Sequence, residues 1–496
     1  MATMALVSYG RRVTDLAAAQ PDAVAFVCEA QTLTRGALER DANRRAREFA
    51  RRGVTCGDLV TLILPNGFEW LKSCLAAWKL GAVPNPLSAR LPARERDAII
   101  ARANPRLIVG LDASEASDRA SVPAGFEPDP ALSADPLPDV TPPHERALAS
   151  GGSTGQPKLI LPRNPGLYDP EAPSAIFKAR AAVLVPGPLY HAVPFSAAWQ
   201  GLFGGAKVVL MRRFEASECL ALIEQHRIDR VHFVPTMMQR IWKLPQAERL
   251  ARDVTSLEFV MTGSAPVPAW VMRSFIEWLG PDVMHEWFGP SERIGGTSIT
   301  GREWLAHPGS VGRPIGSAKM RILDPETLED VSVGEIGEIF MLPPEGPGST
   351  YRYVGANARR TADGWESVGD MGRFDADGYL YLGDRRSDMI LSGGRNIYPA
   401  EVEAALDEHP AVRSSCVIGL PDEDLGSRVH ALVDLLREVR DEELRAHVAE
   451  RLVHYKVPTS FERVSEPLRD DAGKVRRSAL REQRIARIQA ERRLAT

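Results

Sequence analysis

The chain contains little cysteine and no long apolar run, and each shortage excludes a class of protein. Its 496 residues include 5 cysteines, which are scattered without paired spacing. This pattern is typical of reduced thiols and predicts neither a disulfide framework nor a zinc site. No apolar stretch approaches the roughly 20 residues that span a bilayer, so we expect neither a transmembrane segment nor a secretory signal. The predicted location is the cytoplasm.

The chain also lacks an excess of charge of either sign. Lys and Arg number 61 and Asp and Glu number 65, which gives a formal net charge of −4. We therefore expect no nucleic-acid partner. Hydrophobic residues make up 44% of the chain and charged residues 25%, which is ordinary for a globular protein. A chain of this length predicts about three domain-sized units.

The order of strand-like and helix-like segments predicts an α/β fold. Apolar runs typical of buried strands alternate with helical segments such as residues 68–80, and this alternation favours a parallel sheet. The strand-like runs are residues 59–64, 107–110, 182–185, 207–210, 230–234 and 258–261. Between about 305 and 385, frequent glycine and proline with short strands indicate antiparallel β structure. Residues from about 388 to 480 indicate a small α+β domain.

Residues 150–158 form a loop of glycines and hydroxyl side chains that ends in a lysine. Glycines allow the backbone to approach a ligand closely, and exposed N–H groups, hydroxyls and the lysine can bind anionic oxygens. The loop therefore predicts phosphate binding, with a glycine-rich linker as the alternative. It lacks the Gly-Lys-Ser/Thr ending of a Walker A motif, which disfavours a P-loop NTPase. The predicted phosphate-binding residues are Ser150, Gly151, Gly152, Ser153, Thr154, Gly155 and Lys158.

This loop resembles the phosphate loop of the acyl-adenylate-forming superfamily, which includes acyl-CoA ligases, luciferases and peptide-synthetase adenylation domains. The usual pattern there is Ser-Gly-Thr-Thr-Gly-x-Pro-Lys, and the extra residue in this chain is most similar to the bile-acid and steroid CoA ligase branch. The resemblance continues along nearly the whole chain. It implies a large N-terminal domain of two α/β subdomains plus a distorted β-barrel, residues 1–386, and a small mobile α+β C-terminal domain, residues 387–496.

Further motifs match the family's nucleotide-binding residues in order. The segment Phe-Gly-Pro-Ser-Glu at 288–292 matches the family pattern Tyr-Gly-x-Thr-Glu. The match implies that Phe288 packs on adenine, Ser291 faces the α-phosphate and Glu292 binds Mg²⁺, which prefers few carboxylates plus phosphate oxygens. Asp370 matches the ribose aspartate, and Arg385 matches an arginine that contacts the nucleotide. The other residues implied to contact AMP are Gly263, Ser264, Ala265, Pro266 and Gly289.

Two residues are implied to act on the carboxylic acid itself. His191 follows Pro-Leu-Tyr and matches the histidine that lies near the acyl carboxylate, with a purely structural histidine as the alternative. Lys474 follows Asp-Ala-Gly and resembles the lysine of the C-terminal Gly-Lys motif, although the residues around it differ from the usual pattern. A lysine there can bridge the carboxylate and the α-phosphate as charge builds in the transition state.

The segment 391–403 resembles the one that swings in for thioester formation. Its residues Gly393 and Gly394 would leave room for the narrow pantetheine arm beside the backbone. From the residues alone the segment also predicts a β-hairpin that leads into a helix at Pro399. Ser387 occupies the family's hinge position, where Asp or Lys is usual, and a hinge requires tolerance of dihedral change more than one residue type.

The resemblance implies an AMP-forming acid–thiol ligase that uses ATP, Mg²⁺ and coenzyme A. The acid attacks the α-phosphate to give an acyl-adenylate and pyrophosphate, and the thiol of CoA then gives acyl-CoA and AMP. Besides His191 and Gly263, the residues implied to border the acyl pocket are Phe195, Trp199, Met237, Met238, Trp287, Ile294 and Gly295. This set contains no carboxylate that could bind the amino group of an amino-acid substrate. We therefore expect the substrate to be a bulky alicyclic (steroid), aromatic or fatty acid.

Two alternatives stay open. A stand-alone adenylation enzyme could load a carrier-protein thiol instead of CoA, and the two acceptors share the pantetheine arm. A non-catalytic nucleotide-binding protein is disfavoured because Lys474, Glu292 and Asp370 are all retained. The expected partners are a small-molecule carboxylic acid and CoA. The oligomeric state is open, with a homodimer as one option.

Overall fold

A nine-stranded sheet forms the centre of the chain in the computed structural model, with strand order β17-β16-β15-β14-β13-β11-β12-β2-β3. The structure describes residues 6–495 except 117–118, 152–156, 173–180, 386–387, 394, 423 and 471–472. The strands are β2 (Val24–Cys28), β3 (Gln31–Thr34), β11 (Ala182–Val185), β12 (Lys207–Leu210), β13 (Arg230–Phe233), β14 (Phe259–Gly263), β15 (Met284–Phe288), β16 (Thr297–Thr300) and β17 (Arg313–Pro314). The six from β2 to β15 pair in parallel. Their apolar residues are buried on both faces, as parallel sheets require.

Helices cover both faces of this sheet, and the two apolar layers alternate along each strand. Val183 and Val185 of β11 belong to a cluster with the aromatic side chains of α5, whereas Leu184 belongs to the cluster of α7 and α9 on the other face. The helices of this region are α1 (Tyr9–Ala19), α5 (Ala192–Phe203), α6 (Ala216–His226), α7 (Pro235–Trp242), α8 (Gln246–Leu250), α9 (Ala269–Leu279) and α10 (Gly301–Ala306). A short pair, β1 (Val7–Ser8) and β10 (Leu167–Tyr168), joins the N-terminus to this layer.

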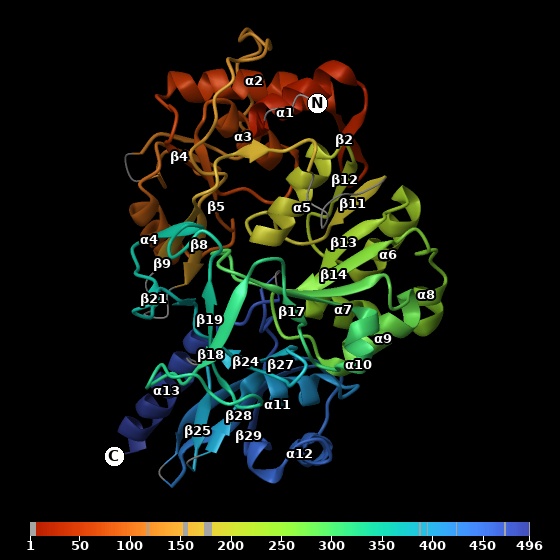
Figure 1. The fold of residues 1–496 in the computed structure, drawn as a ribbon, viewed down its shortest axis with the longest axis vertical. Coiled ribbons are helices and arrows are strands. Elements are labelled where there is room, and N and C mark those ends of the chain that lie inside the picture. Colours follow the sequence, from red (N-terminus) through yellow and green to blue (C-terminus); the bar gives the residue numbers. More distant parts are fainter. Residues whose placement is uncertain are drawn as a thin grey trace.

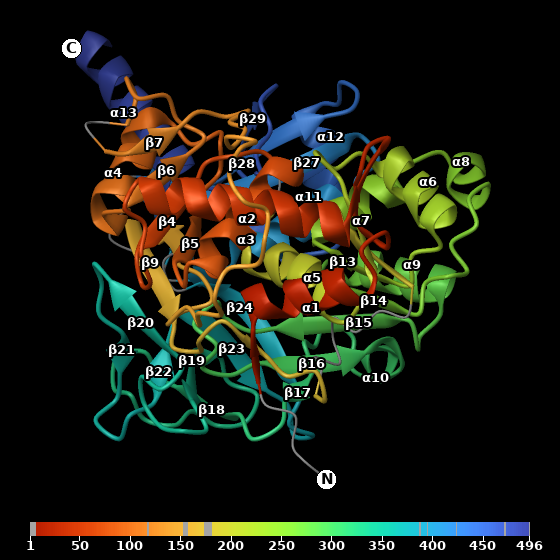
Figure 2. The ribbon, with the colours of Figure 1, turned by 90° about the horizontal axis from the view of Figure 1, so that it is seen from above.

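A second α/β unit contains a parallel sheet in the order β5-β4-β6-β7. Its elements are α2 (Arg35–Arg51), β4 (Leu59–Leu62), α3 (Phe68–Lys79), β5 (Val83–Pro86), α4 (Ala93–Ala103), β6 (Leu107–Val109) and β7 (Ser121–Val122). The strands and the helix predicted at 59–64, 107–110 and 68–80 are confirmed within a few residues. Figure 2 shows α1, α2 and α3 together on the side of the molecule that faces the viewer.

The predicted antiparallel region forms two sheets. The six-stranded sheet contains β18 (Lys319–Leu323), β19 (Gly337–Leu342), β21 (Arg359–Arg360), β22 (Glu366–Ser367), β23 (Asp370–Phe374) and β24 (Leu380–Arg385). The three-stranded sheet contains β8 (Leu148–Gly151), β9 (Pro157–Pro162) and β20 (Tyr351–Val354). Because β20 pairs with β9, the second half of this region lies directly beside the phosphate loop.

The C-terminal elements form a small α+β unit at one end of the longest axis (Figure 1). They are β25 (Ile390–Ser392), β26 (Arg395–Ile397), α11 (Pro399–Asp407), β27 (Val412–Asp422), β28 (Gly426–Leu435), α12 (Asp441–Ala449), the 3₁₀ turn His454–Lys456, β29 (Ser460–Arg463) and α13 (Arg477–Ala495). The predicted fold class, a large α/β part with an antiparallel portion and a small C-terminal α+β part, is confirmed. The boundary at 386–387 falls outside the described residues, so it stays a prediction, as does the mobility of the small part. None of the helices that the structure describes is long and apolar enough to cross a membrane.

Candidate functional site

Four of the predicted site segments follow the carboxyl ends of parallel strands in the large sheet. β11 leads to His191, β13 leads into α7 with Met237, β14 ends at Gly263 and β15 ends at Phe288. Because β11, β13, β14 and β15 are consecutive parallel neighbours, these ends meet at one edge of the sheet. Ligands of open α/β sheets bind at this edge, so the fold brings together motifs that are far apart in the sequence.

Glu292 and Lys158 join the phosphate loop to this edge. The Glu292 side chain is buried, and its Oε1 lies 3.4 Å from Lys158 Nζ. The same oxygen accepts a hydrogen bond from the Tyr353 hydroxyl at 2.5 Å, and Lys158 Nζ lies 3.8 Å from the centre of the Tyr353 ring. Thr350 Oγ1 donates to the Glu292 carbonyl at 2.8 Å. Backbone and side chain of Glu292 are therefore both fixed against β20.

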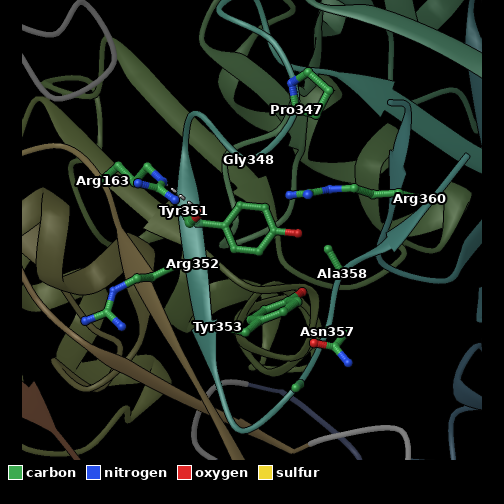
Figure 3. A pocket seen from close by; sticks show the side chains of 10 residues that line it. Arg163, Pro347, Gly348, Tyr351, Arg352, Tyr353, Asn357, Ala358 and Arg360 are labelled. Carbon is green, nitrogen blue, oxygen red and sulfur yellow. Dashed lines mark hydrogen bonds between the residues drawn. The ribbon is translucent and has the colours of Figure 1, made fainter. Parts of the chain in front are cut away.

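Tyr353 was not among the residues predicted from the sequence. Burial and the negative charge of Glu292 raise its pKa, so the phenol stays protonated and can donate. Tyr353 also lines a cavity of about 350 Å³ together with Arg163, Tyr351, Asn357 and Arg360. In Figure 3, Tyr351 and Tyr353 project to the same side of β20, whereas Arg352 points to the other side. The carboxylate of Glu292 therefore lies beside aromatic residues of β20 that no local sequence motif predicts.

The two ends of the predicted phosphate loop belong to neighbouring antiparallel strands, β8 and β9. Ser150 pairs with Lys158 and Gly151 with Pro157 in the antiparallel ladder of β8 and β9. The predicted ligands Gly152, Ser153, Thr154 and Gly155 lie outside the described residues. This strand pair therefore fixes both ends of the loop and places Lys158 beside Glu292.

Two predicted nucleotide residues face each other across a strand pair. Asp370 at the start of β23 pairs with Arg385 at the end of β24, next to an irregularity in the register. In the loop that is predicted to contact AMP, Ser264 follows Gly263 with a φ of 70°. A left-handed conformation is uncommon for a residue other than glycine, and it is a feature of ligand-binding turns. Ala265 and Pro266 continue this turn, and Gly289 and Ser291 follow β15.

The C-terminal lysine reaches the same edge of the sheet from the small α+β unit. Gly473 packs against the start of α7, because a Cβ at this position would lie 2.8 Å from Thr236 Oγ1. Its φ of 75° also favours glycine. The positive charge of the adjacent Lys474 acts on His191 and lowers the pKa of that histidine. The fold therefore brings together two residues that are separated by more than half of the chain.

His191 itself is held in a neutral environment. It precedes α5 in an extended conformation and makes no side-chain cap. Its buried Nε2 has no hydrogen-bond partner among the described residues. Burial and then the charge of Lys474 lower the pKa of His191 to about 3. A neutral imidazole with an unfilled ring nitrogen can bind a carboxylic acid or donate to a carboxylate.

One group of the predicted acyl-pocket residues lies on the α5 side of the sheet. Gly201 of α5 packs on Val183, because a Cβ on Gly201 would lie 2.9 Å from that side chain. The parallel register places Gly263 and Trp287 on the same face of the sheet as Val183, and these two residues pair directly. Trp287 is half-buried, and a Cβ on its partner Gly263 would lie only 2.3 Å from the Trp287 carbonyl oxygen, so the two backbones approach closely. Met237, which is buried on α7, comes within 3.9 Å of a Cβ placed on Gly187 in the turn before His191.

The other predicted pocket residues lie deeper or elsewhere. Phe195 and Trp199 of α5 belong to the aromatic core, with ring centroids 5.7 and 4.7 Å from that of Trp78. Met238 is fully buried. Ile294 packs with the antiparallel strands, and a Cβ on Gly295 would lie 3.1 Å from Met341 Sδ. For all of these residues, contact with an acyl group stays a prediction.

The segment predicted to serve the thioester step forms the expected hairpin. β25 and β26 pair in antiparallel fashion, and Gly393 at the turn has a φ of 54°. Its N–H donates to Leu425 O at 2.9 Å. α11 begins at Pro399, as the sequence predicts. Gly394 and the predicted hinge residue Ser387 lie outside the described residues.

Comparison with known proteins identifies the family of this chain. The family described as AMP-binding enzyme matches residues 13–352, and the AMP-binding enzyme C-terminal domain matches residues 401–474. The chain belongs to the AMP-binding enzymes.

Similar members of this family are named as CoA ligases. The chain is 30% identical to a 2-succinylbenzoate–CoA ligase of Bacillus licheniformis, over 93% of this chain and 97% of that protein. It is 32% identical to a feruloyl-CoA synthase of an Amycolatopsis species, over 93% and 96%. The o-succinylbenzoate CoA synthetase of Bacillus subtilis, solved with its acyl-adenylate, matches with a TM-score of 0.81 and 25% identity over 96% of this chain and 98% of that one. The predicted enzyme class, an AMP-forming acid–thiol ligase, is confirmed at the level of the family.

The site of this AMP-binding enzyme suits the predicted Mg²⁺. The Bacillus subtilis synthetase has also been solved with ATP and a magnesium ion, and the predicted use of ATP, Mg²⁺ and CoA agrees with the family. Here Glu292 offers a buried carboxylate next to the phosphate loop, and one carboxylate with phosphate oxygens and water satisfies magnesium. The bound ion would neutralise phosphate charge.

A second cluster of possible metal ligands consists of His307, Asp375 and Asp377, whose ligand atoms lie within 4.8 Å of one another. Backbone amides already donate to one oxygen of Asp375.

The low pKa of His191 gives a prediction for this enzyme. His191 should stay neutral between about pH 5 and 8, where an ordinary histidine titrates. Because the pKa is lower in the folded state, the neutral ring stabilises the fold above the ordinary value of 6.5, and this contribution is lost as the pH falls below it. The His191 Cε1–H signal in NMR spectra, assigned by its disappearance in His191→Asn, should therefore not move across this range. A midpoint near 6.5 would contradict the buried, neutral environment.

Proposed function

We propose that this AMP-binding enzyme is an ATP-dependent acyl-CoA ligase that converts a bulky alicyclic or aromatic carboxylic acid, ATP and CoA into acyl-CoA, AMP and pyrophosphate. The observation that supports it best is the position of the segment before Lys474: Gly473 packs against Thr236 at the start of α7, at the edge of the sheet where the predicted nucleotide motifs also end, and the charge of Lys474 adds to burial in lowering the pKa of His191. A lysine brought from the far end of the chain to this edge suits a reaction between a carboxylate and a phosphate.

In the first step, the acid attacks the α-phosphate of ATP and pyrophosphate leaves. Lys158 and the backbone of the phosphate loop would hold the phosphates, and Glu292 would hold the Mg²⁺ that neutralises their charge. Phe288 with residues 263–266 would hold the adenine. Lys474 would neutralise charge shared between the carboxylate and the α-phosphate, and His191 would orient the carboxylate. Most of the rate enhancement then comes from positioning and charge stabilisation.

In the second step, the thiol attacks the acyl-adenylate and AMP leaves. A small cavity before His191 is lined by Pro188 and Tyr190 together with Arg90, Arg212 and Arg213. Arg212 pairs with Glu29 at 2.9 Å, and the positive charge that the three arginines bring to this cavity suits the phosphate groups of CoA. We further propose that the small α+β part rotates near residues 386–388 after adenylation, so that the hairpin at Gly393 replaces Lys474 at the reacting atoms.

The pocket wall supports a wide, rigid acid over a straight alkyl chain. Trp287 lies on the α5 face of the sheet beside Gly263, where its half-buried indole would form a bulky wall of the pocket. Buried Met237 offers an adaptable side chain nearby. Aromatic acids are also the substrates in the names of the 2-succinylbenzoate and ferulate ligases to which the chain is similar. The steroid branch indicated by the phosphate loop is the alicyclic form of the same proposal.

A panel of acids tests this proposal. The enzyme, Mg-ATP and CoA are incubated with cholate, aryl acids or palmitate, and acyl-CoA is measured by mass spectrometry. We expect acyl-CoA from cholate or from an aryl acid. Formation of acyl-CoA from palmitate, with none from cholate or from any aryl acid, would contradict the proposed substrate class. A pantetheinylated carrier protein replaces CoA in a parallel series, and thioester on the carrier alone would favour the carrier-loading alternative.

A further inference from the structure

One buried carboxylate connects the two segments that serve the two steps. Glu403 lies on α11, directly after the hairpin at Gly393, and only 4% of it is exposed. Its Oε2 accepts a hydrogen bond from Arg469 Nη2 at 2.8 Å, and its Oε1 accepts one from Arg477 Nη2 at 2.6 Å. These two arginines lie on either side of Lys474 in the sequence.

Each arginine makes further contacts that fix the backbone around the lysine. Arg469 Nη1 donates to the carbonyl of Gly473 at 3.3 Å, and Arg469 forms an antiparallel bridge with Val475. Arg477 donates to Asp388, beside the predicted hinge, at 2.9 Å. Residues 469–470 and 473–477 are here called the lysine loop. Its two arginines connect it to Glu403 on α11, which follows the hairpin at Gly393, and to Asp388 beside the predicted hinge.

The charges of this cluster are balanced so that Glu403 is ionised. Burial alone would raise its pKa, but the charges of Arg477 and Arg469 and the Val417 amide outweigh burial and lower the pKa overall. Two charge-assisted arginine contacts on one carboxylate are strong and directional. A neutral amide at this position would keep the shape of the side chain but lose both ion pairs.

We infer that Glu403 is a positioning residue for Lys474: it holds the lysine loop in the geometry needed for adenylation. The inference rests on the proposed function, because it assigns Lys474 to the first step. Glu403 touches no reacting atom in this account and acts only through the two arginines. Misplacement of a reacting group by about 1 Å can lower a rate about 10²-fold, so its loss should be measurable.

Glu403→Gln tests the inference, and Glu401→Gln is the matched control. Glu401 lies on the same helix but is exposed and pairs with Lys456 at 2.6 Å. Acid-dependent ATP–pyrophosphate exchange measures the first step, and thioester formation from supplied acyl-adenylate measures the second. For Glu403→Gln we expect kcat of the first step to fall on the order of 10–100-fold, with the KM for ATP little changed and the second step within about threefold. Glu401→Gln should resemble the wild type.

Equal loss of both steps in a folded Glu403→Gln protein, or no loss of either, would overturn the inference. Circular dichroism and the melting temperature show whether the variant is folded. If Glu403→Gln does not fold, Arg469→Lys replaces it, because it keeps the charge but not the guanidinium fork, and the same selective loss of the first step is expected. If the wild type itself shows no exchange with any acid, the proposed function has failed, whereas an active wild type with an unaffected variant removes only the role of Glu403.

Discussion

Replacing Lys474 with alanine should lower the rate of acyl-adenylate formation on the order of 10²–10³-fold. The structure places the backbone of this loop against the start of α7 and the charge of Lys474 at His191. The lysine would therefore meet the carboxylate and the α-phosphate where negative charge builds. Because the proposed rotation would replace the lysine loop by the hairpin at Gly393 in the second step, thioester formation from supplied acyl-adenylate should stay within about threefold of the wild type.

The two half-reactions are measured separately for Lys474→Ala, by pyrophosphate exchange and by release of AMP from synthetic acyl-adenylate with CoA. Lys456→Ala is the control, since Lys456 is a second lysine of the same part of the chain and pairs with Glu401. It should leave both rates close to those of the wild type. Equal losses of both half-reactions in Lys474→Ala would show that the lysine does not act in the first step alone.

Replacing Glu292 with glutamine should also lower the rate of adenylation, on the order of 10²-fold. The amide keeps the size of the side chain but removes the charge that faces Lys158 at 3.4 Å and that would bind Mg²⁺ beside the phosphates. We expect the concentration of Mg²⁺ that gives half-maximal rate to rise, because a neutral amide oxygen is a weaker ligand for a hard cation.

Tyr353→Phe is the matched variant for this experiment. It removes the hydroxyl that donates to Glu292 at 2.5 Å but leaves the carboxylate and the ring beside Lys158. A hydrogen bond to a charged group corresponds to a loss of roughly tenfold, so Tyr353→Phe should be less impaired than Glu292→Gln. Pyrophosphate exchange titrated with Mg²⁺ measures both. An unchanged Mg²⁺ dependence in Glu292→Gln would remove Glu292 from the metal site.

Local sequence patterns predicted the elements that carry their own signals. The apolar runs at 182–185 and 207–210 coincide with β11 and β12, because short buried strands need continuous apolar residues on both faces. The strand β27, Val412–Asp422, extends well beyond its continuous apolar residues 416–418. Its flanks include polar residues such as Arg413 and Ser414, and their pairing with β28 depends on tertiary structure. Motif order also predicted that Glu292, His191 and Lys474 belong to one site.

The sequence does not predict the tertiary contacts that hold these residues in position. Tyr353 meets Glu292 only because β20 pairs with β9, across almost two hundred residues of chain. Glu403 meets Arg469 and Arg477 through the packing of α11 on the C-terminal sheet. In both cases, no sequence motif that contains one residue predicts the residue that it contacts. Likewise, the sequence could propose Phe195 and Trp199 as pocket residues, but only the register of the sheet and the aromatic core show how deeply their rings are buried.

The most direct test of the central proposal is the release of pyrophosphate and AMP from Mg-ATP by the purified enzyme with one accepted acid, with and without CoA. We expect acid-dependent pyrophosphate release, with continued turnover and AMP release only when CoA is present. Release of orthophosphate, or pyrophosphate release that does not depend on any acid, would contradict the assignment of an acyl-adenylate and CoA to this site.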